Sequence, residues 1–167
     1  MVILIFSLGA LAAFLITKSY KYMDPYYPTV LYVVLVSLLY PVICRGYMVW
    51  HYPSWGWFTD KVNGLVQSAV YFPCTTVLFL RYFPRRTGSR IAYLAAFVAA
   101  YAIMEGLLLY WKQIIYEHGW NFGWSVFIDV CMFSMIWLHS RSWKAAWAVS
   151  LCILILLLAL FRVPYYA

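Results

Sequence analysis

Two carboxylates lie inside otherwise apolar stretches of this chain. Glu105 lies in IAYLAAFVAAYAIMEGLLLYW and Asp129 lies in FGWSVFIDVCMFSMIWL. A carboxyl group surrounded by hydrocarbon is costly, so it usually faces a partner, a cavity or a substrate path. Such groups can bind a cation, exchange a proton or accept hydrogen bonds from a polar headgroup. The pair is therefore the first place to look for a function.

The composition around this pair is typical of a polytopic membrane protein. Hydrophobic residues make up 66% of the 167 residues and charged residues 10%. A soluble domain is about half apolar and about a quarter charged. The length allows about six spans of roughly 20 residues each and no soluble domain. Many of the 9 Trp and 16 Tyr are expected in belts at the membrane interface.

The hydropathy pattern predicts an all-α integral membrane protein, a bundle of about six transmembrane helices in one domain over residues 1–167. The expected spans are 2–17, 28–45, 62–82, 90–112, 121–139 and 143–162. Pro28 is expected near the start of the second span, Pro41 at a kink in it, and Pro73 inside the third. Residues 46–61 interrupt the pattern and are predicted to form an interfacial or re-entrant loop. The first stretch has neither a basic start nor a cleavage site, so we expect a retained span.

The lysines and arginines indicate an orientation. Eight fall at one end of the predicted bundle: Lys18, Lys21, Arg81, Arg85, Arg86, Arg90, Arg141 and Lys144. Four fall at the other: Arg45, Lys61, Lys112 and Arg162. Cations mark cytoplasmic loops, so the first group is predicted inside and both termini extracytoplasmic. The net charge of +7 does not indicate nucleic-acid binding, because the chain has no module for base recognition.

Helical rise places the two carboxylates at similar depths. Glu105 lies roughly 22 Å along a helix that enters from inside, and Asp129 roughly 12 Å below the outer face. Gln67 falls near the same level, and helical spacing aligns Asn63 with Gln67. We therefore predict an outward-facing polar pocket. Its expected ligand-binding residues are Glu105, Asp129, Gln67, Asn63, Lys112 and His118.

Three functions remain open. In the first, the pocket binds or passes a small cation, a proton or a polar solute. In the second, the polar layer only ties helices together in a structural or accessory subunit of a larger membrane complex. In the third, a membrane enzyme uses Glu105, Asp129 and His118 on a lipid headgroup. We favour the first and expect no enzyme, because the chain has no GxSxG and no Ser or Cys with a recognisable His partner.

Several other side chains are given structural interpretations. Membrane lipids are the expected partners, other membrane subunits are expected only under the second hypothesis, and no cofactor is identified. The outer loops carry His51, Asp60, Glu117, His118 and Asn121, whose spacing matches no metal motif, so we expect no metal site. An outer aromatic belt is predicted for Trp50, Trp55, Trp57, Trp120 and Trp124. The four cysteines are interpreted as buried apolar residues and His139 as part of the inner basic rim.

Five segments occur in an order and spacing that resemble a known family. They are YYPTVLY, FPCTTVLFLRYFP, YAIMEGLLLYW, HGWNFGWS and VCMFSMIWLH, within about residues 26–160. The family comprises small uncharacterised integral membrane proteins of endospore-forming Firmicutes (bacilli and clostridia). The resemblance places Glu105, His118, Gly119, Trp120, Trp124 and His139 on motif positions. Where that family carries an amide in the fifth span, this chain has Asp129. In the loop before the third span it has TDKVNG instead of a proline-asparagine-histidine pattern. The resemblance implies a bacterial plasma-membrane location and no particular activity.

Overall fold

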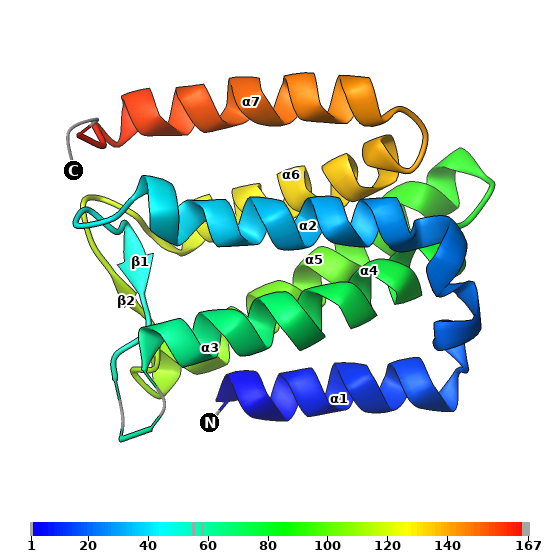
Figure 1. The fold of residues 1–167 in the computed structure, drawn as a ribbon, viewed down its shortest axis with the longest axis horizontal. Coiled ribbons are helices and arrows are strands. Elements are labelled where there is room, and N and C mark those ends of the chain that lie inside the picture. Colours follow the sequence, from blue (N-terminus) through cyan, green and yellow to red (C-terminus); the bar gives the residue numbers. More distant parts are fainter. Residues whose placement is uncertain (1, 55, 58, 165–167) are drawn as a thin grey trace.

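The computed structural model of the protein describes residues 2–54, 56–57 and 59–164. In this part of the chain, six helical segments run back and forth between the two ends of a bundle (Figure 1). They are α1 (Val2–Ile16), α2 (Met23–Ile43), a third helix built from α3 (Asp60–Val66), a π-helical turn (Gln67–Tyr71) and α4 (Phe72–Arg81), then α5 (Thr87–Tyr110), α6 (Phe122–His139) and α7 (Trp143–Leu160). A 3₁₀ turn, Ser19–Tyr22, leads into α2. The prediction of an all-α bundle of about six helices is confirmed.

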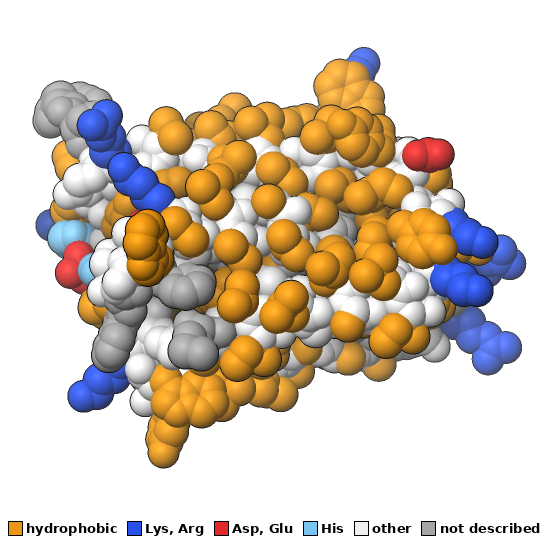
Figure 2. All heavy atoms as spheres, turned by 60° about the horizontal axis from the view of Figure 1, so that its bottom comes forward, with side chains coloured by type: hydrophobic (Ala, Val, Ile, Leu, Met, Phe, Trp, Pro, Cys, Tyr) orange, Lys and Arg blue, Asp and Glu red, His pale blue; other side chains and the backbone are white. Residues whose placement is uncertain are grey.

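Five of these segments are long and apolar enough to cross a membrane. They are Ser19–Ile43, Asp60–Arg81, Thr87–Tyr110, Phe122–His139 and Trp143–Leu160, and α1 is a shorter apolar helix. Figure 2 shows apolar side chains over the middle of one face and Lys and Arg side chains toward the two ends. A water-soluble protein would not expose such a band, so the chain is a multi-pass membrane protein in contact with lipid.

The second helix begins five residues earlier than predicted. It starts at Met23, and Pro25 lies in its first turn, where the missing N–H has no helical partner to lose. Pro28 consequently lies inside the helix and not near its start. The prediction placed the start of the helix at Pro28, whereas a proline is also accepted in the first turn of a helix, as Pro25 is here. The other helix ends lie within about three residues of the predicted bounds.

The loop over residues 46–61 is confirmed as a break between spans, but it contains a strand that the sequence pattern did not predict. Trp50–His51 (β1) pairs antiparallel with Ile115–Tyr116 (β2), which lies between α5 and α6. The Glu117 backbone N–H extends the pairing by donating to the Val49 carbonyl at 2.8 Å. This ribbon lies at the end of the bundle that also holds the two termini (Figure 1).

The third helix widens for one turn immediately before Pro73. Proline has no N–H, so an α-helical bond to the carbonyl four residues earlier cannot form there. A π-helical turn over Gln67–Tyr71 accommodates this gap in the hydrogen-bond ladder. The Thr75 hydroxyl then donates to the Tyr71 carbonyl at 2.8 Å. Pro73 therefore stays inside a continuous transmembrane helix.

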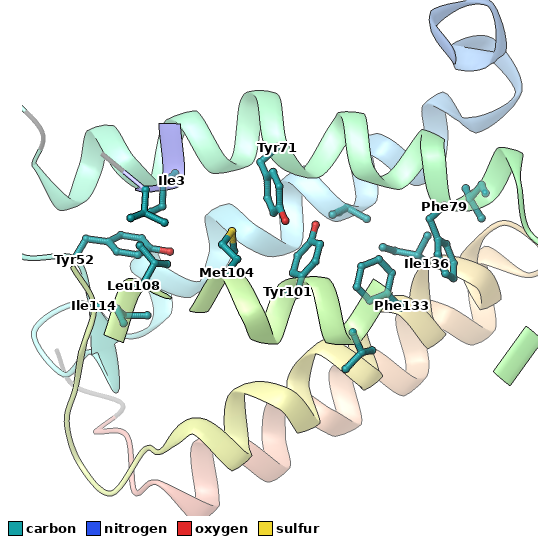
Figure 3. Close-up of a cluster of buried hydrophobic side chains, with 14 of the residues drawn as sticks. Ile3, Tyr52, Tyr71, Phe79, Tyr101, Met104, Leu108, Ile114, Phe133 and Ile136 are labelled. Carbon is teal, nitrogen blue, oxygen red and sulfur yellow. The ribbon is translucent and has the colours of Figure 1, made fainter. Parts of the chain in front are cut away.

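An aromatic core fills the space between α4, α5 and α6 (Figure 3). We use this term for the contacting rings of Phe79, Tyr93, Phe97, Tyr101 and Phe133. Phe79 and Phe133 are fully buried, with ring centroids 5.0 Å apart. The Tyr71 and Tyr101 hydroxyls point toward one another in Figure 3, and Thr75 bonds Tyr101 at 2.7 Å. The core is closely packed and its polar atoms are paired.

Helix α7 is attached to the rest of the bundle mainly through α6. Ala146 is the buried residue of α7, and the rest of that helix is half-buried or exposed. Its exposed positions include Leu151, Ile155, Leu156 and Leu160. Helix α7 therefore lies at the edge of the bundle, with space between it and α2.

Candidate functional site

The predicted carboxylate pair borders a cavity of about 450 Å³. Its walls come from α2, the third helix, α5, α6 and α7, and one end is lined by residues of the β1 and β2 loops. Most lining side chains are apolar. The polar ones include Ser37, Gln67, Ser68, Glu105, Ser125, Asp129 and Ser150, together with the tyrosines at positions 32, 40, 52 and 101. The site is a largely apolar chamber with one acidic pair, and so it is less polar than predicted.

Glu105 is held by side chains from the strand and helix that follow α5. The Tyr116 hydroxyl donates a short hydrogen bond to the Glu105 Oε1 atom. Ser125 lies within hydrogen-bond reach of the same carboxyl group and contacts the Tyr116 hydroxyl at 3.3 Å. The Trp120 indole N–H donates to the Ser125 hydroxyl at 2.9 Å. These contacts fix the direction of the Glu105 carboxyl group.

Asp129 lies one helix away and is much less well satisfied. Its Oδ2 atom is buried and has no hydrogen-bond partner among the described residues. The Asp129 carboxyl group is close enough to Glu105 for their charges to interact. Sequential helices with a short connection pack side by side, which explains why the pair meets. A buried unpartnered carboxyl oxygen is rare because desolvation makes it unfavourable.

Gln67 joins the acidic pair from the third helix. Its Oε1 atom accepts a hydrogen bond of 3.0 Å from the Tyr52 hydroxyl. Tyr52 itself is fixed because its backbone N–H donates to Asp60 at 2.9 Å. Burial and the nearby Glu105 charge raise the pKa of the Tyr52 phenol above its usual range. Tyr52 therefore lies near Glu105 as a neutral hydrogen-bond donor.

Aromatic side chains close the end of the cavity beside the β1–β2 ribbon. Trp120 is only 9% exposed, and its ring packs on Phe161 with centroids 5.0 Å apart. Val49 completes this cluster, and Tyr40 holds the backbone of Trp50 through two hydrogen bonds of 2.8 and 3.0 Å. The interfacial-belt prediction is wrong for Trp120, whose indole N–H finds a partner inside the protein.

The other members of the predicted belt differ among themselves. Trp50 is half-buried and stacks on Tyr40, with ring centroids 4.6 Å apart. Trp57 is 94% exposed, as a belt residue would be, and Trp124 packs on Phe161. Trp55 lies outside the described residues.

Burial and the hydrogen bond to Glu105 raise the pKa of Tyr116. The Tyr116 phenol therefore stays neutral, as that of Tyr52 does.

A second polar cluster closes the opposite end of the cavity. The Tyr32 and Ser150 hydroxyls form a short hydrogen bond that joins α2 to α7. The Tyr32 ring stacks on His139, with centroids 4.3 Å apart, and meets Trp147 edge-on. His139 is buried and its Nδ1 atom lies 3.0 Å from the Thr29 hydroxyl. His139 therefore contacts neighbouring helices and not only the inner basic rim.

Three predicted site residues do not line the cavity. Lys112 lies two residues beyond the end of α5, where a φ of 54° turns the chain away from the helix face of Glu105. Asn63 is half-buried one turn beyond the cavity wall. His118 is exposed, stacks on Tyr47 and approaches Glu117 at 3.9 Å. The structure thus unites Glu105, Asp129 and Gln67, and it does not bring His118 to the acidic pair.

Three lining residues of the site were given no role in the sequence prediction: Tyr32, Tyr52 and Ser150. Tyr116, which holds Glu105, was missed too. Ser125 lies one helical turn before Asp129, and this spacing is the signal that links it to the pair. The part of the chain described here brings together no group of three His, Cys, Asp or Glu side chains that could hold a metal ion. The cysteines at 44, 74, 131 and 152 are free thiols, and burial raises the pKa of Cys44.

Comparison of the chain with models of protein families, with curated proteins and with solved structures found no match. The fold and the site themselves define the chain as a multi-pass membrane protein with an internal acidic pair.

Proposed function

We propose that this membrane protein binds a small cation, or the positively charged or proton-donating group of a polar solute, between Glu105 and Asp129. The observation that carries the proposal is the buried Asp129 Oδ2 atom, which has no hydrogen-bond partner in the described part of the chain and belongs to a carboxyl group on the cavity wall. Among the described residues, no Lys, Arg or His lines the cavity. A positive partner for the pair would therefore come from outside the described residues.

The surroundings support a binding role for the pair. Charges interact strongly where water is excluded, so two carboxyl groups in an apolar chamber attract a cation or retain a proton. Tyr116 and Ser125 orient Glu105 before any ligand arrives, and this reduces the ordering needed on binding. Asp129, by contrast, keeps one oxygen that no described residue bonds. Glu105 is the oriented member of the pair and Asp129 the one that gains a partner.

Binding is tested by the thermal stability of the protein in lipid nanodiscs. Chlorides of sodium, potassium and methylammonium are each compared at equal ionic strength with N-methyl-D-glucamine chloride. A ligand that binds only the folded state raises the melting temperature, by about 2–4 °C for each kcal/mol gained. We expect at least one of the three small cations to raise it.

The matched variants are Glu105→Gln and Asp129→Asn in the cavity, with Glu117→Gln in the exposed loop as the control. The cation effect should disappear in the two cavity variants and persist in the control. The same rise in all four proteins would exclude the acidic pair as the binding site, and no rise with any small cation would contradict binding of a small cation.

Location and orientation form part of the proposal. The resemblance to the membrane proteins of endospore-forming Firmicutes supports a bacterial plasma membrane, and the distribution of Lys and Arg supports a cytoplasmic position for the end that holds Arg85 and Arg86. Both described ends of the chain lie at the opposite end of the bundle (Figure 1). A protease-accessible tag on each terminus should be cleaved from outside intact cells. Cleavage only after lysis would reverse the orientation.

A further inference from the structure

The cavity reaches the surface of the bundle between α2 and α7. Val36 on α2 is 39% exposed and Leu151 on α7 is 57% exposed, and both side chains also line the cavity. They lie within transmembrane segments, away from the loops at either end. The surface beside them faces lipid. The cavity therefore opens sideways into the hydrocarbon layer.

The two ends of the cavity are closed by hydrogen-bonded or stacked groups. At one end the Tyr32–Ser150 bond joins the two helices that flank the opening. At the end beside the β1–β2 ribbon the Trp120 and Phe161 rings are packed together and buried. Ser150 and Phe161 are about three helical turns apart, roughly 16 Å along α7. The easiest path for a ligand is consequently from the bilayer.

The walls beside this opening suit an alkyl chain. One face of α7 presents apolar side chains at helical spacing: Leu151, Leu154, Leu157 and Leu158. Met132 and Met135 line the opposing wall from α6. Unbranched thioether side chains adapt to ligands of irregular shape. An apolar chain can lie against these walls without displacing any hydrogen bond described above.

Charge distinguishes one part of this chamber from the rest. Glu105 and Asp129 are its acidic groups, and no cationic side chain of the described residues borders it. We propose, building on the cation-binding role of this pair, that the ligand is an amphipathic organic cation with a single alkyl chain. It enters from the bilayer between α2 and α7. Its ammonium group lies at Glu105 and Asp129, and its chain lies against the inner face of α7.

The probes are radiolabelled dodecyltrimethylammonium and tetramethylammonium, measured on nanodiscs of zwitterionic lipid with empty nanodiscs subtracted. Dodecanol is the third probe, and it carries the same alkyl chain without a charge. Saturable binding is expected for dodecyltrimethylammonium and at least tenfold weaker binding for the other two, which corresponds to about 1.4 kcal/mol. Glu105→Gln should weaken binding of the long-chain cation at least tenfold, and Glu117→Gln should not.

The entrance is tested with two leucines of α7 that are similarly exposed. Leu151→Trp fills the opening, whereas Leu156, which is 60% exposed, does not line the cavity. We expect Leu151→Trp to reduce binding of dodecyltrimethylammonium at least tenfold and Leu156→Trp to leave it within about twofold. Both changes lie on an exposed surface, so this comparison holds even if Glu105→Gln does not fold.

The outcomes separate this inference from the cation-binding proposal. Stabilisation by small cations that is lost in Glu105→Gln, without preferred binding of the long-chain cation, would retain the acidic site and overturn the amphipathic ligand. Equal binding to Leu151→Trp and Leu156→Trp would overturn entry between α2 and α7. Binding that survives Glu105→Gln would overturn the placement of the ammonium group. A dimer that must dissociate before the probe binds would assign the opening to a second copy of the chain and overturn the inference.

Discussion

The two sides of α6 are packed in opposite ways. Phe133 faces α4 and α5, is fully buried and contacts the rings of Phe79, Phe97 and Tyr101. Met132 is the neighbouring residue and borders the cavity between α2 and α7. The first side is filled by interlocking rings, and the second leaves a chamber with flexible walls. The contrast separates the part of the bundle that sets stability from the part that is free to accept a ligand.

The largest difference between the two sides should appear in the free energy of unfolding. Phe133→Ala opens a void inside the aromatic core and should lower it by about 3–5 kcal/mol. Leu154→Ala shortens a half-buried cavity wall, encloses no new void, and should lower it by less than about 1 kcal/mol. Denaturant titration in bicelles measures both. Equal losses would mean that the cavity wall is packed as tightly as the core.

The acidic pair is the costly part of the cavity side, and Tyr116 is the hydrogen-bond donor that stabilises it. Tyr116→Phe removes the hydrogen bond to Glu105 and should lower the free energy of unfolding by about 1.5–3 kcal/mol, because the acceptor can be charged. Tyr110→Phe is the matched control, since Tyr110 is 80% exposed and should change it by less than about 0.5 kcal/mol. A similar result for both would show that the Glu105 carboxyl group does not depend on Tyr116.

Alkaline pH should act on the end of the cavity beside the β1–β2 ribbon. The pKa values of Tyr52 and Tyr116 are raised in the folded state, so the folded protein binds these phenol protons more tightly than the unfolded chain. Their contribution is fully present below pH of about 10 and is lost as pH rises above it, by about 1.4 kcal/mol per pH unit for each tyrosine. Unfolding titrations at alkaline pH should show a shallower loss for Tyr52→Phe and Tyr116→Phe than for Tyr110→Phe. Parallel curves would contradict a raised pKa.

The smallest effect is expected where α2 and α7 meet. Ser150→Ala removes the bond to Tyr32, and hydrogen bonds between membrane helices contribute about 0.6 kcal/mol on average. Backbone hydrogen exchange should increase along α7 and remain unchanged in α4. Cys152→Ala changes an exposed position of α7 and serves as the control. Exchange that rises equally in α4 would show that α7 does not move independently of the aromatic core.

Sequence reasoning identified the helices and the acidic pair because both depend on local signals. Apolar stretches of about 20 residues predict spans, and a short connection between α5 and α6 predicts that Glu105 and Asp129 lie on neighbouring helices. The same reasoning misplaced the start of α2, because a proline within the first turn resembles a proline before a helix. It also placed Lys112 in the pocket with Glu105, because helical spacing does not reveal that α5 ends at Tyr110.

The remaining features depend on contacts between distant segments. A two-residue strand has no periodicity, so the β1–β2 ribbon that brings Tyr116 to Glu105 has no sequence signature. From the sequence alone, Trp120 could equally face the membrane interface or pack on Phe161 inside the bundle. The cavity itself arises because α7 packs mainly on α6, and a hydropathy pattern gives no information about a space between two apolar helices.

The π-helical turn before Pro73 makes the third helix tolerant of losing one residue. A π-helical turn holds one residue more than an α-helical turn, so deleting Ala69 would restore α-helical geometry and leave the segments on either side in nearly the same relative orientation. Gln67 would stay at the cavity and Thr75 would keep its place beside Tyr101. A one-residue deletion should therefore be tolerated at this turn more readily than in a regular α-helical part of the same span.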